Sequence, residues 1–342
     1  MPVDAFELTT VADDAVVLHL GDETFRHDGL RPDTDYDFEG VPAHTLSRPE
    51  GELLCRFATV NDVHFGETEC GRIDDHPLGP ILSRGSGEPP YPELMNAGAV
   101  GEMASIDPVA VIVKGDLSND GNDDEWAAFE ACYRTAFGER LHVVRGNHDA
   151  HHGASAYSGD EWIELPGLAV ALLDTTIPFA TPGALRQDQI EWLDDHLATA
   201  GRTLLLGHHQ QWVPGGDGAE RRSDDYFGLH PDTSDALDAV FVRHPNAIAY
   251  AAGHTHRHRV RRMAASGRPT IEVGCVKDFP GTWAEYRVFE GGVMQVVHRI
   301  SDPQALRWSN RCRVLYRDFG VDYEQYALGA LQDRCFVIPV GP

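Results

Sequence analysis

Five short motifs along the chain carry side chains that bind metal ions through oxygen or nitrogen. Their donors are carboxylates, an asparagine amide and imidazoles, without a thiolate. Such a set suits Fe, Mn or Zn better than Cu(I) or an iron–sulfur cluster. Together the motifs predict a site that holds two metal ions. They are Asp62-Val63-His64, Gly115-Asp116, Gly146-Asn147-His148-Asp149, Gly207-His208-His209 and Gly253-His254-Thr255-His256.

Two metal ions held close together suit the hydrolysis of a phosphate ester. That reaction needs a nucleophile at neutral pH, neutralised charge on the phosphoryl oxygens and a proton for the leaving oxygen. Two cations about 3.5–4 Å apart meet the first two needs, because they share a hydroxide of lowered pKa and clamp the substrate oxygens. A carboxylate is the natural bridge between such ions, and Asp116 fits that role.

Each motif follows a short apolar run that is typical of a buried β-strand. An open α/β sheet binds ligands at the carboxyl ends of its strands, so such runs would bring the motifs to one edge. A single Asp-x-His is as often a surface pair, and a single Gly-Asp is often a turn with a helix cap. The complete set in this order indicates metal chemistry. The runs are Arg56–Val60, Val109–Val113, Leu141–Val144, Thr203–Leu206 and Ile248–Ala252.

Strands and helices alternate between about residues 52 and 300, which indicates a layered α/β domain. The 3.6-residue period predicts helices over Asp123–Phe137, Gln187–Ala200 and Ser234–Arg243. Two loops rich in glycine and proline, Gly66–Tyr91 and Val213–Pro231, follow strand ends. Loops of this length are usually functional or mobile, so we expect both to take part in substrate recognition.

Residues 1–50 are predicted to form a partial β-module that leans on a catalytic domain of residues 51–300. Ala15–Leu20 is an expected strand. The stretch from Leu30 to Tyr36 resembles the tyrosine corner of fibronectin type III-like sandwiches, in which a Tyr hydroxyl bonds to upstream backbone. An ordinary turn with a buried tyrosine is the alternative. A complete sandwich needs about 100 residues, so the module can only be partial.

Residues 301–342 contain several aromatic side chains and are too apolar for a disordered tail. We expect this C-terminal extension to pack on the catalytic domain. None of the six cysteines belongs to a C-x-x-C pair, so reduced thiols are expected. Cys312 and Cys335 are the one pair worth checking for a disulfide.

The chain has a formal net charge of −26 and a pI near 4.9. Such an acidic surface repels phosphates, so neither nucleic acid polymers nor membranes are expected partners. A small phosphorylated substrate is compatible, because bound metal ions reverse the local field. The N-terminus lacks the basic and apolar regions of a secretory signal, and we expect a cytoplasmic protein. A homo-oligomer is possible, and the sequence does not decide the oligomeric state.

The five motifs, in this order, resemble those of the calcineurin-like metallophosphoesterase superfamily over roughly residues 55–275. The resemblance implies an α/β fold: a four-layer sandwich of two mixed β-sheets flanked by helices, with the site at the strand ends. It also implies the metal ligands. The first ion would be held by Asp62, His64, Asp116 and His256, and the second by Asp116, Asn147, His208 and His254.

The resemblance also assigns roles to residues that bind no metal. His148 would donate a proton to the leaving oxygen or stabilise the transition-state phosphoryl group. Asp149 would orient His148 and hold it protonated. For His209 three roles are open: a contact to substrate or support behind the ligands, an inert neighbour, or a metal ligand.

Within the superfamily the chain is most similar to bacterial class III cyclic nucleotide phosphodiesterases and glycerophosphodiesterases, on residues 115–119 and 173–176. It departs from that branch at residues 210–212, where prolines are usual, and in its C-terminal extension. Hydrolysis of a small phosphodiester, such as a cyclic nucleotide, is the leading interpretation. The alternatives are a phosphomonoesterase of nucleotides or sugar phosphates and, more remotely, a non-catalytic scaffold of the same fold.

Overall fold

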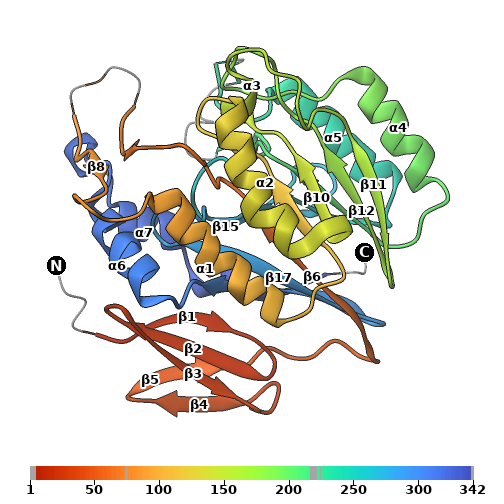
Figure 1. Ribbon diagram of the computed structural model, residues 1–342. Coiled ribbons are helices and arrows are strands. Elements are labelled where there is room, and N and C mark those ends of the chain that lie inside the picture. Colours follow the sequence, from red (N-terminus) through yellow and green to blue (C-terminus); the bar gives the residue numbers. More distant parts are fainter. Residues whose placement is uncertain (1–4, 74–75, 77, 216–221, 224, 340–342) are drawn as a thin grey trace.

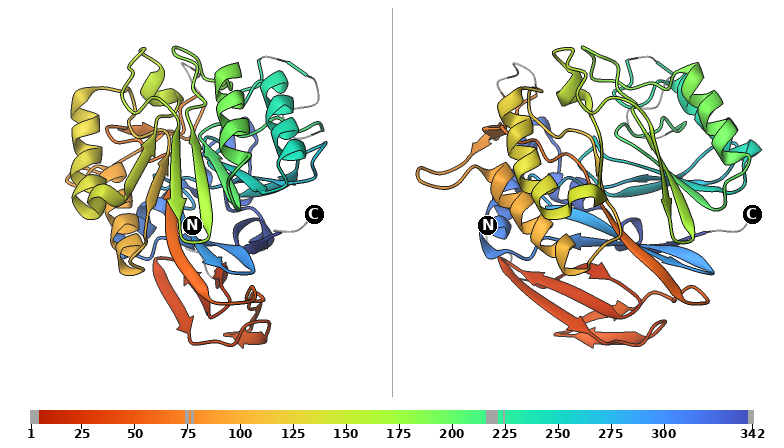
Figure 2. Two further views of the ribbon diagram at one scale, coloured as in Figure 1. Left: turned by 90° about the vertical axis from the view of Figure 1, so that its right-hand side faces the viewer. Right: turned by 45° about the vertical axis from the view of Figure 1, so that its right-hand side comes forward.

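Two large β-sheets packed face to face, with helices on both outer surfaces, form the centre of the computed structural model (Figure 1 and Figure 2). The structure describes residues 5–73, 76, 78–215, 222–223 and 225–339. Residues 1–4 and 340–342, and parts of both predicted recognition loops, lie outside the described residues. The four-layer α/β sandwich expected from the motifs is confirmed.

The first large sheet carries three of the five motif strands. Its strand order is β10–β9–β6–β17–β18–β19. Strands β10, β9 and β6 run parallel, and each later neighbour in the order is antiparallel to the one before it. The strands span Leu141–Val144 (β10), Val111–Lys114 (β9), Leu53–Val60 (β6), Thr282–Phe289 (β17), Gly292–Arg299 (β18) and Phe336–Ile338 (β19).

The second large sheet carries the other two motif strands, in the order β11–β12–β13–β14–β16–β15. Strands β12, β13, β14 and β16 are parallel, and the edge strands β11 and β15 are antiparallel to their neighbours. The strands span Glu161–Leu165 (β11), Leu168–Leu173 (β12), Thr203–Gly207 (β13), Ala247–Ala252 (β14), Pro269–Glu272 (β16) and Arg259–Arg262 (β15).

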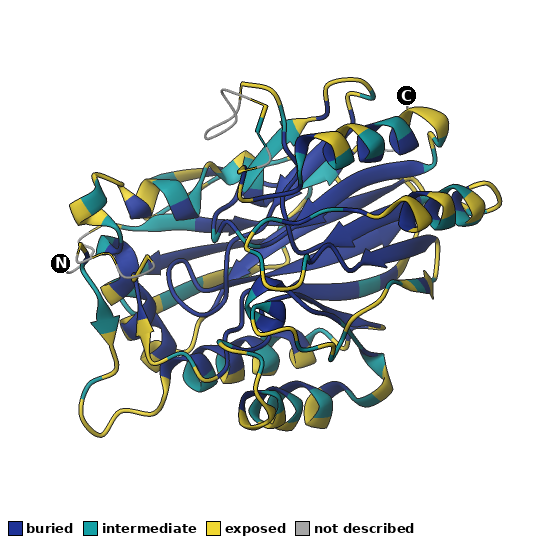
Figure 3. Cartoon of the chain, turned by 90° about the horizontal axis from the view of Figure 1, so that it is seen from above, coloured by how far each residue is buried: buried dark blue, intermediate teal, exposed yellow. Residues whose placement is uncertain are grey.

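The central strands are buried on both faces, and this explains why they are continuous apolar runs rather than alternating ones. In β13, Leu204 and Leu206 pack into the core between the two sheets. Leu205 points the other way, into the core under the helices, as the two-residue period of a strand requires. Figure 3 shows the central strands of the sheets largely buried, whereas the helices carry exposed residues.

Two helices cover each sheet, α1 and α2 on the first and α4 and α5 on the second (Figure 2). The helix predicted over Asp123–Phe137 is confirmed at the same bounds. The helix predicted over Gln187–Ala200 ends at Leu197, and the one predicted over Ser234–Arg243 begins earlier, at Pro231. The observed bounds are Tyr91–Ser105 (α1), Asp123–Phe137 (α2), Gln187–Leu197 (α4) and Pro231–Arg243 (α5).

Helix α2 begins and ends where local chemistry requires. The side chain of Asn122 accepts a hydrogen bond from the backbone N–H of Glu125, which satisfies one of the open donors of the first turn. Acidic residues in that turn stabilise the helix, because they lie at the positive end of its dipole. At the other end Gly138 has φ +55°, a left-handed conformation that glycine adopts at little cost.

Helix α1 is not predicted by the 3.6-residue period. Gly98 and Gly101 lie inside it and weaken its helix propensity. The helix is held by tertiary contacts, because its buried side chains Met95, Ala99 and Met103 join the core shared with α2 and the first sheet.

The N-terminal strands form a small sheet and a hairpin beneath the first large sheet (Figure 1). Val16 and Leu18 pack there against Met294 of β18. The hydroxyl of Tyr36 accepts a hydrogen bond of 2.9 Å from the backbone N–H of Arg31, the contact expected of a tyrosine corner. That residues 1–50 form a separate module stays a prediction. The strands span Glu7–Val11 (β1), Ala15–Leu20 (β2), Glu23–Asp28 (β3), Asp35–Phe38 (β4) and Val41–His44 (β5).

The C-terminal segment runs over the first sheet and ends beside it as β19, which pairs with β18. All six cysteines, Cys312 and Cys335 included, are free thiols. No helix in the described part of the chain is long and apolar enough to cross a bilayer. The remaining short elements are β7 (Glu69–Cys70), β8 (Leu82–Ser83), α3 (Asn147–Ala150), α6 (Pro303–Arg311), α7 (Tyr323–Leu328) and α8 (Leu331–Arg334).

A buried ion cluster on β17 makes the stability of the fold depend on pH. Glu285 lies 2.9 Å from His298 Nε2 and accepts a hydrogen bond of 2.9 Å from Arg287. Burial opposes its ionisation, but His298 and Arg287 together lower the pKa of Glu285 from 4.5 to about 2. A carboxyl whose pKa is lowered by folding stabilises the fold above its unfolded pKa, and that contribution is lost as the pH falls toward the folded value.

We expect the wild-type protein to be more stable than its Glu285→Gln variant at pH 7 by up to about 3 kcal/mol, since one pKa unit is worth about 1.4 kcal/mol. The difference should shrink between pH 4.5 and pH 3, where the wild-type carboxyl begins to lose its advantage. Urea denaturation of both proteins at pH 7 and pH 3 measures it. A difference that does not change with pH would contradict this account.

Candidate metal centre

The five predicted strands bring all five motifs to the same edge of the sandwich. Backbone hydrogen bonds join the loops that follow β6 and β9: the N–H of Asp62 donates to the carbonyl of Gly115, and the N–H of His64 to that of Asp116. The N–H of Gly253, after β14, donates to the carbonyl of His208, after β13. The motifs after β6 and β9 are therefore fixed to each other, as are those after β13 and β14.

The first group of predicted ligands surrounds a common centre. Donor atoms of Asp62, His64 and His256 all lie within 4.8 Å of one another. His256 Nε2 is 3.6 Å from Asp62 Oδ1, and His64 Nε2 is 3.4 Å from Asp116 Oδ2. Two ligands that each lie about 2.1 Å from a metal ion are separated by about 3–3.5 Å. These spacings fit donors arranged around one ion.

The second group lies directly beside the first and shares Asp116 with it. His208 Nε2 is 3.3 Å from Asp116 Oδ2 and 3.0 Å from Asn147 Oδ1. The rings of His208 and His254 are 5.0 Å apart. Because Asp116 Oδ2 is within 3.4 Å of both His64 and His208, this carboxylate joins the two groups. A bridging ligand must occupy such a position.

Most of the predicted ligands have a strained backbone. Asp62, His64, Asp116, His254 and His256 all have φ between +47° and +68°, the left-handed region that side chains with a β-carbon rarely adopt. Strain of this kind costs about 1–3 kcal/mol per residue and is concentrated at functional sites. The loops after β6, β9 and β14 thus hold their side chains in directions that an extended strand could not provide.

Two motif glycines are required by close packing against the ligands themselves. A β-carbon at Gly115 would overlap the ring of His208, and one at Gly146 would overlap Oδ1 and the backbone nitrogen of Asp116. Gly115 also has φ +86°. The glycine that precedes the ligand in each of these motifs therefore lets another motif approach it.

Replacing Gly146 with alanine is expected to push Asp116 out of position and to weaken metal binding at least about tenfold, the lower end of the effect of disturbing groups that orient a ligand. Inductively coupled plasma mass spectrometry after equilibration with limiting Mn or Zn measures the bound metal. Gly101→Ala in α1 is the matched control, since a β-carbon there meets nothing within 4 Å. Equal metal content in both variants would show that the contact is not needed.

Hydrogen bonds and burial prepare the histidines to bind metal. The ring nitrogens of His64 are buried and have no hydrogen-bond partner, an arrangement that is costly unless a ligand supplies one. His208 Nδ1 donates to the carbonyl of Lys114 at 2.9 Å, which directs Nε2 toward Asp116. His254 Nε2 donates to the carbonyl of Phe227 at 2.8 Å, which leaves Nδ1 as its ligand atom.

The electrostatics favour neutral imidazoles beside ionised carboxylates, the forms that bind metal. Burial lowers the pKa of His64 to about 4 and that of His254 to about 3. Burial opposes the ionisation of Asp116, but His208 and His148 hold its pKa well below the ordinary value. His208 and His256 differ. Burial opposes the protonation of both, yet Asp116 raises the pKa of His208 to about 9, and Cys275 and Asp62 hold the pKa of His256 well above its ordinary value. These two imidazoles must release a proton to bind a metal ion. The donor set, its spacing and its orphaned nitrogens fit two metal ions.

His148 lies between the ligands and the open side of the site. Its ring is 4.5 Å from that of His64, and its backbone N–H donates to Asp116 Oδ1 at 2.9 Å. Its Nδ1 lies 3.0 Å from the carbonyl oxygen of Asn119. Because a carbonyl can only accept, Nδ1 must carry a proton, and Nε2 is the nitrogen that can exchange one.

The hydrogen bonds of Asp149 run to other partners than the expected one. Among the described residues no hydrogen bond or ion pair joins its carboxylate to the ring of His148, whose Nδ1 lies against the carbonyl of Asn119. The Asp149 carboxylate accepts hydrogen bonds from the backbone N–H groups of Leu117, Ser118 and Gly146 at 2.7–3.0 Å, and from the Ser118 hydroxyl. Those bonds satisfy more acceptor sites than an imidazole could, so Asp149 positions the loops that carry Asp116 and Asn147.

His209 lies behind the ligands rather than on the open side. Its Nδ1 is 2.8 Å from the hydroxyl of Thr175, and its Nε2 is 3.0 Å from the carbonyl of Thr181. Both ring nitrogens are thus occupied by protein, which argues against the expected contact to substrate. Support of the neighbouring ligands His208 and His254 is the role that this geometry favours.

Two residues that support the ligands were not identified from the sequence. Asp278 Oδ2 lies 3.6 Å from His256 Nδ1, on the side away from Asp62. No ligand motif contains Asp278, so the sequence does not single it out. Asn61 Nδ2 donates to the carboxylate of Asp62, and its Oδ1 accepts from Lys114 Nζ at 2.9 Å. Its position directly before Asp62 was the only available signal.

The site opens into a pocket of about 480 Å³. Asp116, Asn147, His148, His254 and His256 line its polar end. Pockets that bind small molecules have volumes of about 300–1,000 Å³. The pocket can therefore accept a small molecule with a charged group at the ligand cluster.

The chain was compared with families of known proteins. The model of the family described as calcineurin-like phosphoesterase matches residues 55–258, which contain all the predicted ligands. The chain is 29% identical over 180 residues to the 3′,5′-cyclic adenosine monophosphate phosphodiesterase CpdA of Pseudomonas aeruginosa, covering 50% of this chain and 63% of that protein. It is 28% identical over 239 residues to a cAMP/cGMP dual specificity phosphodiesterase of Mycobacterium tuberculosis, covering 60% and 74% respectively.

The chain thus spans less than two thirds of the length of the Pseudomonas aeruginosa relative. Among solved structures, a dimetal phosphatase from Danio rerio has a TM-score of 0.52 at 17% identity, covering 73% of this chain and 98% of that one. At that identity the likeness concerns the fold alone.

Proposed function

This chain belongs to the calcineurin-like phosphoesterase family, and from that premise we propose that it hydrolyses a small phosphodiester with two bound metal ions. Its relatives support a metal-dependent hydrolase of phosphoric esters. The proposed ions are Fe, Mn or Zn. The proposed ligands are Asp62, His64, Asp116, Asn147, His208, His254 and His256.

One observation carries the proposal: donors from five separate strand ends approach one another around a shared carboxylate. A structural ion-pair cluster would satisfy its own hydrogen bonds, whereas here both nitrogens of His64 are left without a partner. When bound, divalent ions would neutralise the phosphoryl oxygens and lower the pKa of water.

Three residues of the chain would have separate roles in the reaction. Asp116 would hold the two ligand groups in a fixed relation, so that the phosphoryl group is oriented for attack. His148, with Nδ1 committed to Asn119, would donate a proton or a hydrogen bond from Nε2 to the leaving oxygen. Asp149 keeps the loops of Asp116 and Asn147 in place through the backbone.

The same ligand set would serve a phosphomonoester, so the preference for a diester is supported by the names of the relatives alone. The net charge of −26 supports a small phosphorylated substrate over a nucleic acid polymer, which the surface would repel. Loss of catalysis in a scaffold would be expected to remove ligands or the proton donor. Here all of them are present.

A metal-reconstituted assay tests the proposal. Protein stripped with a chelator and reloaded with Mn, Fe or Zn is offered a nucleoside monophosphate, a 3′,5′-cyclic nucleotide and a glycerophosphodiester. The products followed are phosphate from the monoester, the ring-opened nucleoside monophosphate from the cyclic nucleotide and the free alcohol from the glycerophosphodiester. We expect hydrolysis of a diester only after reloading, and faster than that of the monoester. Turnover of none of the three with any of the metals would overturn the proposed activity, and a faster monoester would reassign it.

A further inference from the structure

The pocket above the metal centre has one polar end and one aromatic end, and the aromatic end comes from the C-terminal segment. Four aromatic residues of that segment line the pocket, and we call them the aromatic wall: Tyr316, Phe319, Tyr323 and Tyr326. Their rings follow one another at centroid distances of 6.5, 5.1 and 6.1 Å, from Phe319 through Tyr316 and Tyr323 to Tyr326.

Apolar residues from other elements complete this end of the pocket and are exposed to solvent. Ile73 is 43% exposed, Phe227 38% and Val321 37%. They belong to the few large apolar residues that the described part of the chain leaves exposed. Phe227 lies in the second predicted recognition loop, and its ring is 5.6 Å from that of His254. A ligand held at the metal centre would reach these side chains and remove them from water.

The aromatic wall is fixed to the metal-binding loops themselves. The hydroxyl of Tyr326 donates to the carbonyl of Thr255, which lies between two predicted ligands, at 3.1 Å. The hydroxyl of Tyr323 donates to Asp278, the partner of His256, at 2.8 Å. Because these two hydroxyls are used in this way and Tyr323 is buried, the part of the wall open to a ligand is the half-buried rings of Tyr316, Phe319 and Tyr326.

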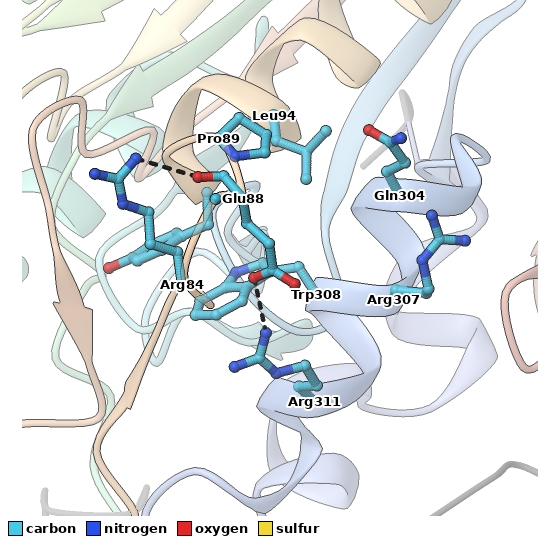
Figure 4. A pocket seen from close by; sticks show the side chains of 10 residues that line it. Arg84, Glu88, Pro89, Leu94, Gln304, Arg307, Trp308 and Arg311 are labelled. Carbon is cyan, nitrogen blue, oxygen red and sulfur yellow. Dashed lines mark hydrogen bonds and ion pairs between the residues drawn. The ribbon is translucent and has the colours of Figure 1, made fainter.

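The segment that carries the aromatic wall is also anchored by contacts of α6 with α1 and with the loop before it. Trp308 of α6 stacks on Tyr91 of α1 with ring centroids 4.2 Å apart. Arg311 of α6 pairs with Glu88 at 3.2 Å, as Figure 4 shows, and its guanidinium lies over the ring of Trp308. The wall is therefore built before any ligand arrives, which lowers the entropic cost of binding.

Resting on the proposed function, we propose that the aromatic wall is a base-binding subsite, so that the substrates are phosphodiesters bearing a nucleobase rather than a glycerol or amino-alcohol group. Bases of any sequence stack on aromatic rings through their π faces. An aliphatic alcohol has no such face and would leave the half-buried rings of Tyr316, Phe319 and Tyr326 partly in water. Phosphate recognition stays with the metal ligands, and selectivity comes from the wall.

Phe319→Ala tests the proposal, because Phe319 makes no hydrogen bond to the metal loops and its ring contacts only Tyr316 and His76 among the described aromatic rings. Phe38→Ala is the matched control: it also removes a half-buried phenylalanine whose ring lies against a histidine, His27, but in the N-terminal β-strands. Metal-loaded wild type and both variants are compared on 3′,5′-cyclic AMP and on glycerophosphoethanolamine, a diester without an aromatic group.

We expect Phe319→Ala to lower kcat/KM for cyclic AMP about tenfold, mainly through KM, which corresponds to about 1.4 kcal/mol. The value for glycerophosphoethanolamine should stay within about twofold. Equal losses on both substrates, or no loss on cyclic AMP, would overturn the subsite.

Binding of adenosine 5′-monophosphate by isothermal titration calorimetry gives a readout that does not need turnover. Affinity should fall about tenfold in Phe319→Ala and not in Phe38→Ala. If wild type hydrolyses neither diester but shows this difference in binding, the proposed reaction fails and the subsite stands. If wild type hydrolyses diesters and the variants bind equally, the subsite fails and the reaction stands.

Discussion

Replacement of Asp116 by alanine is expected to remove both metal ions together and to reduce hydrolysis to background. Its Oδ2 is the atom that approaches a donor of each group, 3.4 Å from His64 and 3.3 Å from His208. Every other predicted ligand belongs to one group. Loss of a terminal ligand would therefore weaken one site, whereas loss of Asp116 deprives both of their shared negative charge.

The backbone makes this residue harder to replace than its neighbours. Asp116 has φ +52°, its Oδ1 accepts the N–H of His148, and its carbonyl accepts the N–H of His64. The carboxylate thus also orders the loop that carries the proposed proton donor. An Asp116→Asn variant keeps the shape and removes the charge, and it should show the same loss of metal if charge is what the ions require.

Metal content by mass spectrometry and hydrolysis rate are measured together. Asp120→Ala is the control, since it deletes an exposed carboxylate four residues further along the same loop and should leave two ions per chain. An Asp116→Ala protein that keeps a full complement of metal would show that this residue is not the bridge.

Replacement of His148 by alanine is expected to keep both metal ions while lowering kcat by about 10²–10⁴, the usual contribution of a general acid. His148 lines the pocket but has a partner for Nδ1 in the carbonyl of Asn119. The imidazole of His148 is therefore oriented by the protein and is not needed as a metal ligand. Its removal would leave phosphate binding to the metal ligands, so KM should change little.

The leaving group provides a second measure of the same role. A substrate whose leaving alcohol has a low pKa needs less protonation, so the defect of His148→Ala should be smaller on a nitrophenyl ester than on an alkyl ester. His152→Ala is the control, because His152 is exposed and lies four residues along the chain. Wild-type turnover by His148→Ala would remove His148 from the mechanism.

The sequence by itself determined the strands that carry the motifs and predicted the candidate ligand set. Apolar runs such as Thr203–Leu206 are strands buried on both faces, and a run of this kind is visible locally because burial on two sides demands apolar residues at every position. The ligands followed from their place after these runs, since the carboxyl ends of parallel strands lie at one edge. The glycines of the motifs belong to the same local signal, and two of them, Gly115 and Gly146, let another motif approach.

Only the tertiary structure decided which groups surround this set. Asp149 was expected beside His148, its neighbour in sequence, but the turn of α3 directs its carboxylate to the N–H groups of Leu117 and Ser118. Helix α1 carries too weak an apolar stripe to be recognised, and its core contacts come from α2. Asp278 and Tyr323 meet across 45 residues of chain. Periodicity reports which face of an element is buried, but contacts between distant segments depend on how whole elements pack, and no local pattern contains that information.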